Sequence, residues 1–288
     1  MQNFLKILHA SLIDNYSESE IRVFGYLILE NLTGLSRTQL LVRKDIKLTD
    51  EQEEKTVRFL ERLKANEPLQ YILGETEFYG LKFEVNASVL IPRPETEELV
   101  EWASKDLRTN TGKSGLDVEK MKILDIGTGC GCIPIALKKA HPEAVISAMD
   151  VSLDALTVAK KNAELNQVEI EFIQEDISRP KATHRKWNVI VSNPPYIPLS
   201  EKKEMDKGVK DYEPHIALFS PTEKPLIFYH KIAAYALSHL EPNGIIYFET
   251  HKDYSRKVAL LLGNYGFKQV FIRNDISGNE RMVKGSLS

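Results

Sequence analysis

The chain has 288 residues, of which 42% are hydrophobic and 27% are charged, and its formal net charge is −3. This length allows one large domain or a large domain with a small partner, and the composition is that of a globular protein with a sizeable core. The slightly acidic balance argues against a protein that coats nucleic acid, because phosphate binding favours a basic face.

The cysteine content and the apolar segments of the chain exclude further classes of protein. Cys130 and Cys132 are the only cysteines; they are too few for a disulfide framework and, without a histidine cluster, do not form a zinc ligand set. No apolar run is long enough to cross a membrane, and the acidic N-terminal stretch lacks a small-residue cleavage site. We therefore expect a cytoplasmic protein with no membrane partner and no metal.

The first part of the chain, residues 1–68, has the pattern of a small helical bundle. Ser17 and Glu20 have the spacing of a capping box, and Thr49 and Gln52 repeat it. Apolar residues follow each box at helical intervals: Ile21, Phe24, Ile28 and Leu32, then Val57, Leu60 and Leu63. Nothing in this part is typical of catalysis, so we expect an interaction or docking domain.

Residues 69–92 predict a β-hairpin that links this bundle to the rest of the chain. Gly74 and Gly80 punctuate an alternating apolar pattern. Pro94 then suits the first turn of a helix, with glutamates near its positive end. The polar stretch 108–120 is rich in Gly, Ser and Thr and predicts a loop that leads into the main domain.

From Met121 onward, strands alternate with helices. The predicted strands cover 122–127, 144–150, 169–176, 187–195, 244–250, 267–275 and 281–286. The predicted helices cover 132–142, 152–166, 225–240 and 255–266. This alternation predicts an α/β fold with a mostly parallel sheet covered on both faces. The last two strands have no helix between them, so we expect an antiparallel hairpin at the C-terminal end.

Three glycines, Gly127, Gly129 and Gly131, lie between the first of these strands and its helix. Glycines at this position let a ligand approach the backbone and the helix N-terminus closely. The pattern is G-x-G-x-G, with Cys132 where a dinucleotide motif would have its third glycine, and the lysine of a phosphate-binding loop is absent. A pyrophosphate ligand is therefore not favoured, and a simple tight turn remains the alternative.

Asp150 supplies the second half of this signal. It ends the next strand, about 20 residues after the glycines, where a carboxylate can accept hydrogen bonds from ribose hydroxyls. Either feature alone would indicate a turn or a surface aspartate, but together they predict a nucleoside site without a diphosphate. S-adenosylmethionine fits that description, and the two cysteines are expected to pack beneath the loop as small residues.

The stretch Asn193-Pro194-Pro195-Tyr196 ends a strand whose carboxyl end should lie beside the glycine loop. The Asn193 side-chain oxygen and a backbone carbonyl held by the prolines can accept both N–H groups of a planar NH2, while Tyr196 packs on it. Methyl transfer to such a nitrogen would depend mainly on positioning. Adenine N6, cytosine N4 and a glutamine amide all satisfy this chemistry; a strand terminator with a core tyrosine is the structural alternative.

Four segments resemble the PrmC/HemK family of protein-(glutamine-N5) methyltransferases, which act on peptide chain release factors. They are IPRPETEEL at 91–99, ILDIGTGCG at 123–131, SNPPYI at 192–197 and YEPHIAL at 212–218. The P-R-P-E-T-E run is the most specific, and it separates this group from enzymes that methylate a ribosomal protein glutamine. Two departures are Cys130, where the family usually has a small or hydroxyl residue, and FSPTEKPL at 219–226, where paired glycines are common.

The resemblance implies a class I S-adenosylmethionine-dependent methyltransferase fold of Rossmann-like type, with a docking domain at 1–68, a hairpin linker at 69–92 and a catalytic domain at 93–288. The implied substrate is the glutamine of the Gly-Gly-Gln loop in class I release factors, gripped by Asn193 to Tyr196. The residues expected to hold the cofactor are Gly127, Thr128, Gly129, Cys130, Gly131, Asp150, Asp176, Ile177 and Asn193.

Three alternatives remain at this point. A methyltransferase of adenine N6 in nucleic acid would be expected to have a basic face or a target-recognition domain, and neither is evident. A ribosomal protein glutamine is the second alternative, and a non-catalytic cofactor-binding module is the third. The intact Asn-Pro-Pro-Tyr segment weighs against the last, and we expect no direct nucleic-acid partner.

Overall fold

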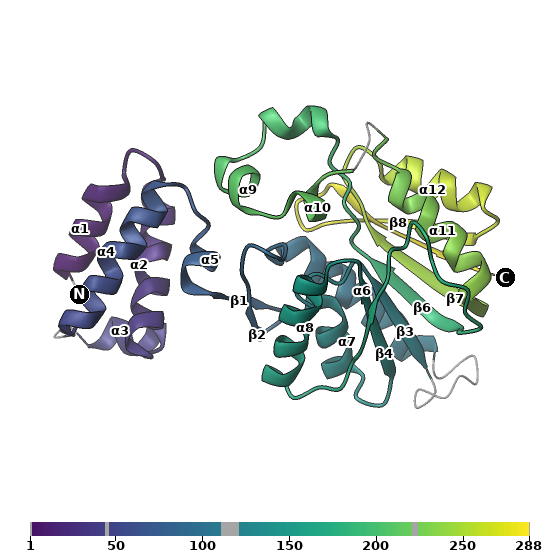
Figure 1. Ribbon diagram of the computed structural model, residues 1–288, viewed down its shortest axis with the longest axis horizontal. Coiled ribbons are helices and arrows are strands. Elements are labelled where there is room, and N and C mark those ends of the chain that lie inside the picture. The colour runs from purple at the N-terminus through teal and green to yellow at the C-terminus, as the bar shows by residue number, and fades with distance from the viewer. Residues whose placement is uncertain (1, 44–45, 111–120, 221–223, 288) are drawn as a thin grey trace. The chain divides into compact units, whose positions relative to one another are not determined.

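The computed structural model describes residues 2–43, 46–110, 121–220 and 224–287 (Figure 1). The chain divides into two compact units. One, which we call the helical unit, comprises Met1–Glu75 and Asp206–Tyr212; the other, the sheet unit, comprises Thr76–Met205 and Glu213–Ser288. The domain boundaries expected at 68 and 92 stay predictions. Of the loop expected at 108–120, residues 108–110 continue a helix and 111–120 lie outside the described residues.

The helical unit is built from short amphipathic helices. They are α1 (Gln2–Leu12), α2 (Glu18–Thr33), α3 (Arg37–Val42), α4 (Asp50–Lys64), α5 (Leu69–Leu73) and α9 (Lys207–Tyr212). Both expected capping boxes are present, at Ser17 before α2 and Thr49 before α4. Of the apolar residues at helical intervals in α4, Leu60 and Leu63 are buried, whereas Val57 is 56% exposed and the preceding Thr56 is buried instead.

A β-hairpin follows at the expected place, although the short helix α5 within 69–92 was not predicted. Strands β1 (Glu75–Phe78) and β2 (Leu81–Glu84) form a two-stranded sheet. The two residues between them, Tyr79 and Gly80, both have positive φ, of 52° and 71°. Two such residues are typical of the hairpin turn whose twist matches its strands.

The sheet unit contains a seven-stranded sheet with the order β5-β4-β3-β6-β7-β9-β8. Its strands are β3 (Lys122–Ile126), β4 (Val145–Asp150), β5 (Glu171–Gln174), β6 (Trp187–Ser192), β7 (Leu240–Glu249), β8 (Lys268–Asn274) and β9 (Glu280–Ser286). The first five pair in parallel, whereas β9 pairs antiparallel with both β7 and β8. The predicted mostly parallel sheet with a C-terminal antiparallel hairpin is confirmed.

Helices cover both faces of this sheet (Figure 1). On one face lie α6 (Pro94–Asn110), α7 (Cys132–Ala140) and α8 (Leu153–Leu165), and on the other lie α11 (Ile227–His239) and α12 (Ser255–Asn264). Two further short elements were not predicted, the 3-10 helix η2 (Leu199–Lys203) and helix α10 (His215–Leu218). None of the helices within the described ranges is long and apolar enough to cross a bilayer.

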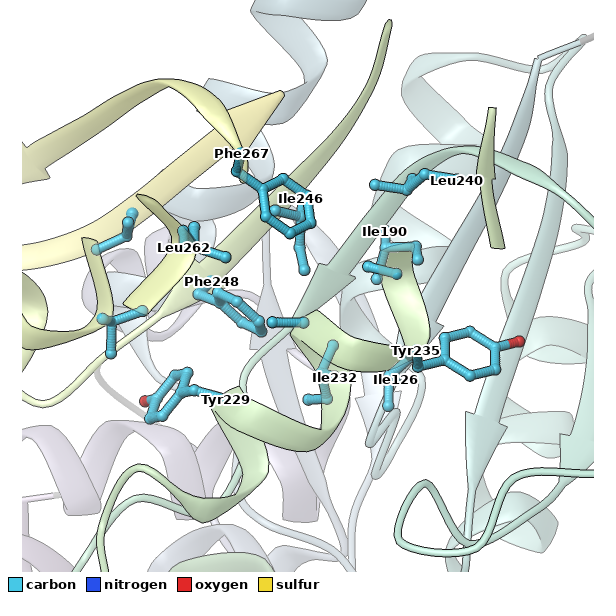
Figure 2. Packing of buried hydrophobic residues seen from close by; sticks show 14 of the residues in the cluster. Ile126, Ile190, Tyr229, Ile232, Tyr235, Leu240, Ile246, Phe248, Leu262 and Phe267 are labelled. Carbon is cyan, nitrogen blue, oxygen red and sulfur yellow. The ribbon is translucent and has the colours of Figure 1, made fainter. Parts of the chain in front are cut away.

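The core between the sheet and α11 and α12 fixes the carboxyl ends of the central strands. Alternate residues of β3, β6 and β7 point to this face and pack against the two helices (Figure 2), because side chains along a strand have a period of two. Figure 2 labels the strand residues Ile126, Ile190, Ile246 and Phe248 and the helix residues Tyr229, Ile232 and Leu262. Asp125, the neighbour of Ile126, therefore points to the opposite face.

Candidate active site

A cavity of about 330 Å³ lies at the carboxyl ends of the parallel strands, in the sheet unit. Strand register aligns Ile126, the end of β3, with Met149 on β4 and Ser192 on β6, so the segments after these strands meet. The predicted site residues that line the cavity are Gly127, Gly129, Asp150, Asp176, Ile177, Asn193, Pro194 and Pro195. Thr128, Cys130, Gly131 and Tyr196 are not among the lining residues.

The glycine loop, residues 127–131, uses its glycines for two different reasons. Gly127 and Gly129 have φ of 77° and 54°, and a Cβ at either position would meet nothing within 4 Å. Backbone conformation therefore requires them, since other residues rarely adopt positive φ. Gly131 has φ 84°, and a Cβ there would also lie 3.1 Å from the Ala159 Cβ on α8. The loop thus leaves its cavity side open while its far end packs against a helix.

Asp150 holds the glycine loop against the end of β4. Its Oδ2 accepts a hydrogen bond from the Gly129 N–H at 2.9 Å, and its Oδ1 accepts one from the Ser152 N–H at 2.9 Å. Ser152 caps α8 as predicted. Burial raises the pKa of Asp150, opposed by these backbone bonds. Each carboxylate oxygen keeps a second lone pair, which a ligand hydroxyl in the cavity can use.

The electrostatic character of the cavity excludes some ligands. Asp150, Glu175 and Asp176 line it, and the described residues that line it include no lysine, arginine or histidine. Such a lining disfavours phosphate groups and favours a ligand that carries positive charge. S-adenosylmethionine, a sulfonium with ribose hydroxyls and an ammonium group, fits this lining, the open glycine loop and the cavity volume, which lies within the usual range for small-molecule sites.

The Asn193 to Pro195 segment forms the wall beside the glycine loop. The Asn193 Nδ2 donates a hydrogen bond to Thr96 Oγ1 at 3.3 Å, which is the one hydrogen bond of this side chain within the described ranges. Tyr196 lies outside the cavity lining, and its Oη reaches Glu249 Oε1 at 3.5 Å. Burial raises the pKa of Tyr196 beyond its already high value, so the phenol stays protonated.

Two further segments close the cavity and are tied together. Leu90 lines it from the segment before α6, and Ile216 and Ala217 line it from α10. Arg93 Nη2 bonds Glu213 Oε1 at 2.5 Å, and the Ile91 N–H donates to the other oxygen of Glu213 at 3.3 Å. Because Glu213 is only 3% exposed, this ion pair joins the two walls where solvent screens it weakly.

Comparisons with known proteins agree with these features. Residues 5–74 match the PrmC N-terminal domain family, and residues 103–209 match the methyltransferase small domain family. The chain is 45% identical over 284 residues to "Release factor glutamine methyltransferase" of Flavobacterium psychrophilum, covering 99% of this chain and 98% of that protein. The chain belongs to the PrmC/HemK family of release factor glutamine methyltransferases.

Other relatives of the family and a solved structure extend the match. The protein of the same name in Bacteroides thetaiotaomicron is 36% identical over 284 residues, which is 98% of this chain and 99% of that protein. A methyltransferase structure from Pyrococcus furiosus has a TM-score of 0.51 at 15% identity and covers 83% of this chain and 98% of its own. That likeness supports the class I methyltransferase fold of the sheet unit.

Sequence reasoning missed three polar residues at this site: Asp125, Thr96 and Glu249. Among the described residues, neither oxygen of Asp125 nor the Oγ1 of Thr128 has a hydrogen-bond partner, although both are buried. Burial raises the pKa of Asp125 to about 7. An acidic residue inside the apolar run of β3 was the available signal for Asp125. Thr96 lies in the P-R-P-E-T-E run that carries the family resemblance, but neither that run nor the strand end at Glu249 indicated a role, because both roles arise from contacts between distant segments.

Proposed function

We propose that this protein transfers the methyl group of S-adenosylmethionine to the side-chain amide nitrogen, N5, of the glutamine in the Gly-Gly-Gln motif of class I peptide chain release factors. The observation that carries the proposal is that Asn193 and the glycine loop line one cavity, in a chain that matches release factor glutamine methyltransferases over nearly its whole length. The acidic lining of the cavity suits the sulfonium cofactor. The Asn193 oxygen and the backbone carbonyl of the proline pair are the acceptors proposed for the glutamine amide.

The cofactor side of the site consists of the glycine loop and the three strand ends beside it. Of the predicted loop 127–131, Gly127 and Gly129 line the cavity and would present backbone to the ligand. Asp150 would accept from ribose hydroxyls, and Asp176 and Ile177, which also line the cavity, would border the adenine. Cys130 and Cys132 are free and buried, which suits small packing residues under the loop. When bound, S-adenosylmethionine supplies an electrophilic methyl carbon on a positively charged sulfur.

The substrate side of the site handles a poor nucleophile. The lone pair of a carboxamide nitrogen is delocalised into its carbonyl, so the amide must be oriented and its two N–H groups must be accepted. The Asn193 Oδ1 accepts one, and the backbone carbonyl of the rigid Pro194–Pro195 pair accepts the other. Tyr196 supports this clamp from behind as a protonated phenol. The rate enhancement comes from positioning and from a preorganised polar site, without a strong base.

The helical unit is proposed to dock the release factor, and the match of residues 5–74 to the PrmC N-terminal domain family supports a separate N-terminal domain. It carries ordinary capped amphipathic helices whose apolar faces form their own core. The exposed apolar residues at the end of α3, Leu41 and Val42, which are 54% and 76% exposed, are candidates for contact with the protein substrate.

A labelled-methyl assay tests this function. The full chain is incubated with methyl-labelled S-adenosylmethionine and, separately, with a release factor, with the same factor carrying Gln→Ala in its Gly-Gly-Gln motif, with ribosomal protein and with DNA. We expect label on the intact release factor alone. Label on DNA or ribosomal protein instead would overturn the proposal, as would equal labelling of the Gln→Ala factor.

A further inference from the structure

Thr96 connects Asn193 to a buried carboxylate, that of Glu249, which the proposed chemistry does not yet use. It lies in the first turn of α6 and is 3% exposed. Its Oγ1 donates a hydrogen bond to Glu249 Oε2 at 2.5 Å and accepts one from Asn193 Nδ2 at 3.3 Å. Glu249, at the end of β7, is 1% exposed. A continuous chain of hydrogen bonds therefore links a buried carboxylate to the amide that borders the cavity.

The direction of these bonds follows from the chemistry of the groups. A threonine hydroxyl has one hydrogen, and an ionised carboxylate can only accept. While Glu249 is ionised, the Thr96 hydrogen is committed to it, so Thr96 can only accept from Asn193. The NH2 end of the Asn193 side chain must then face Thr96. Since Asn193 also lines the cavity, its oxygen is the end left for a ligand there.

Glu249 also contacts Tyr196, which lies behind Asn193 and the two prolines. Its second oxygen, Oε1, lies 3.5 Å from the Tyr196 Oη, a long hydrogen bond in which the phenol donates. The backbone oxygen of Glu249 accepts from the Tyr229 Oη at 3.0 Å, which holds the end of β7 in place. One buried carboxylate thus restrains Asn193 through Thr96 and Tyr196 directly.

We propose that Thr96 and Glu249 are positioning residues that orient the Asn193 amide, so that its oxygen and not its NH2 group faces the glutamine amide of the substrate. This inference rests on the proposed function, because only an NH2-bearing acceptor needs an oxygen there. In the reversed orientation, the Asn193 NH2 would oppose the substrate NH2 and one of the two acceptors would be lost. The hydrogen-bonded chain of Glu249, Thr96 and Asn193, which we call the relay, therefore selects between a productive and an unproductive orientation of the Asn193 amide.

The hydrogen bonds between Glu249, Thr96 and Asn193 depend on pH. Burial raises the pKa of Glu249 to about 7. The groups that face it and modify this value are Thr96, Tyr196 and Arg281, which lower it, and Glu95, which raises it. Above about pH 7, Glu249 is ionised and accepts from Thr96. Below it, a protonated Glu249 can donate to Thr96, which frees the Thr96 hydrogen to bond the Asn193 oxygen and stabilises the reversed amide. Turnover should therefore fall as pH falls through about 7.

Four variants of the full chain test the relay, assayed for methylation of a release factor. Thr96→Val removes the hydroxyl at constant shape, and we expect kcat to fall about tenfold, the size of one lost hydrogen bond, with the dissociation constant of S-adenosylhomocysteine unchanged. Thr96→Ser keeps the hydroxyl and should restore kcat to within about threefold of the wild type. Ser104→Ala is the matched control, because it removes another buried hydroxyl of α6, one bonded to His141.

Glu249→Gln separates the relay from other titrating groups. The glutamine amide does not titrate, and with its oxygen accepting from the Tyr196 Oη its NH2 faces Thr96 at every pH, so we expect a low kcat with no fall through pH 7. This distinguishes Glu249 from His251, whose ring lies 5.9 Å from Tyr196 and whose pKa is lowered by burial. Melting curves of all variants identify any loss of kcat that comes from unfolding. If Thr96→Val proves unfolded, the comparison of Thr96→Ser and Glu249→Gln with the wild type carries the test.

Provided that the wild type methylates the release factor, three results would overturn the proposed positioning role. They are a wild-type kcat in Thr96→Val, equal impairment of Thr96→Ser and Thr96→Val, or a fall in the kcat of Glu249→Gln below pH 7 that matches the wild type. A drop in the Ser104→Ala control as large as that of Thr96→Val would also overturn it. Absence of release factor methylation by the wild type would instead defeat the proposed function itself, so the two failures are distinguishable.

Discussion

The two sides of the cavity are constructed differently. The glycine loop is a local structure: five consecutive residues take their shape from backbone conformation, and one carboxylate on the neighbouring strand, Asp150, holds it. The Asn193 clamp is also a short segment, but its orientation depends on Thr96 and Glu249, which lie 97 positions before and 56 positions after Asn193 in the chain. In the proposed function, backbone groups bind a cofactor that many enzymes share, whereas side chains whose orientation depends on the whole fold bind the acceptor.

This difference has a mechanistic consequence. Backbone N–H groups and a carboxylate bind a ligand without needing an orientation to be chosen, so the loop should tolerate changes elsewhere in the sheet unit. An asparagine amide has two ends of nearly equal shape and opposite hydrogen-bonding character. The clamp should therefore be sensitive to substitutions that leave the cavity shape and cofactor binding unchanged.

Replacement of Asn193 should have the largest effect. Asn193→Ala removes the acceptor oxygen, and we expect kcat to fall by about 10²–10³, the range seen when one preorganised polar group is lost from a reacting centre. Affinity for S-adenosylhomocysteine, measured by calorimetry, should weaken only modestly. Asn188→Ala is a matched control, since this asparagine lies at the opposite end of β6 and accepts from the Lys122 N–H. Unchanged turnover in Asn193→Ala would refute the acceptor role.

The glycine loop can be divided by comparing two of its glycines. Gly131→Ala would force an alanine to φ 84° and place its Cβ 3.1 Å from Ala159 and 3.2 Å from Ile135. We expect the free energy of unfolding to fall by about 3 kcal/mol, from backbone strain and overpacking together. Gly129→Ala has only the backbone strain, so about 1 kcal/mol is expected. Chemical denaturation measures both; equal losses would show that packing against α8 plays no part.

The Arg93–Glu213 ion pair tests whether the two walls of the cavity are tied together. Arg93→Met removes the cation beside a buried carboxylate, and we expect a loss of about 2–3 kcal/mol of folding free energy, below the usual 3–5 because the arginine side chain is 33% exposed. Glu213→Gln in the same chain should recover part of the loss. A double-mutant cycle by denaturation measures the coupling, and strictly additive losses would mean that the two walls are not tied by this pair.

Local patterns in the sequence predict most of the fold and the cofactor side of the cavity, but not the contacts that orient Asn193. The strand and helix alternation, the caps at Ser17 and Thr49, and the glycine loop are local patterns, and all were predicted. Leu60 and Leu63 of the α4 pattern are buried, whereas Val57 is exposed, because the buried stripe of this helix runs through Thr56, Leu60 and Leu63. Helices α3, α9 and α10 have four to six residues, too short for a periodic signal. The P-R-P-E-T-E run marked the segment of Thr96 but not its role, and Glu249 carried no signal, because the fold alone brings Thr96 to Asn193 and Glu249 to Thr96.

Replacement of Asp150 should have the smallest effect, and it should affect cofactor binding but not turnover. Asp150→Ala removes the acceptor for ribose hydroxyls and the support of the Gly129 N–H, so affinity for S-adenosylhomocysteine should fall about tenfold or somewhat more, the value of one charge-assisted hydrogen bond. Because the clamp is untouched, kcat at saturating cofactor should stay within about threefold of the wild type. Asp154→Ala, which removes an exposed carboxylate four residues along, controls for the change in charge. If Asp150→Ala lowered kcat as much as Asn193→Ala is expected to, while the affinity for S-adenosylhomocysteine stayed unchanged, the cofactor and acceptor sides of the cavity would not act separately.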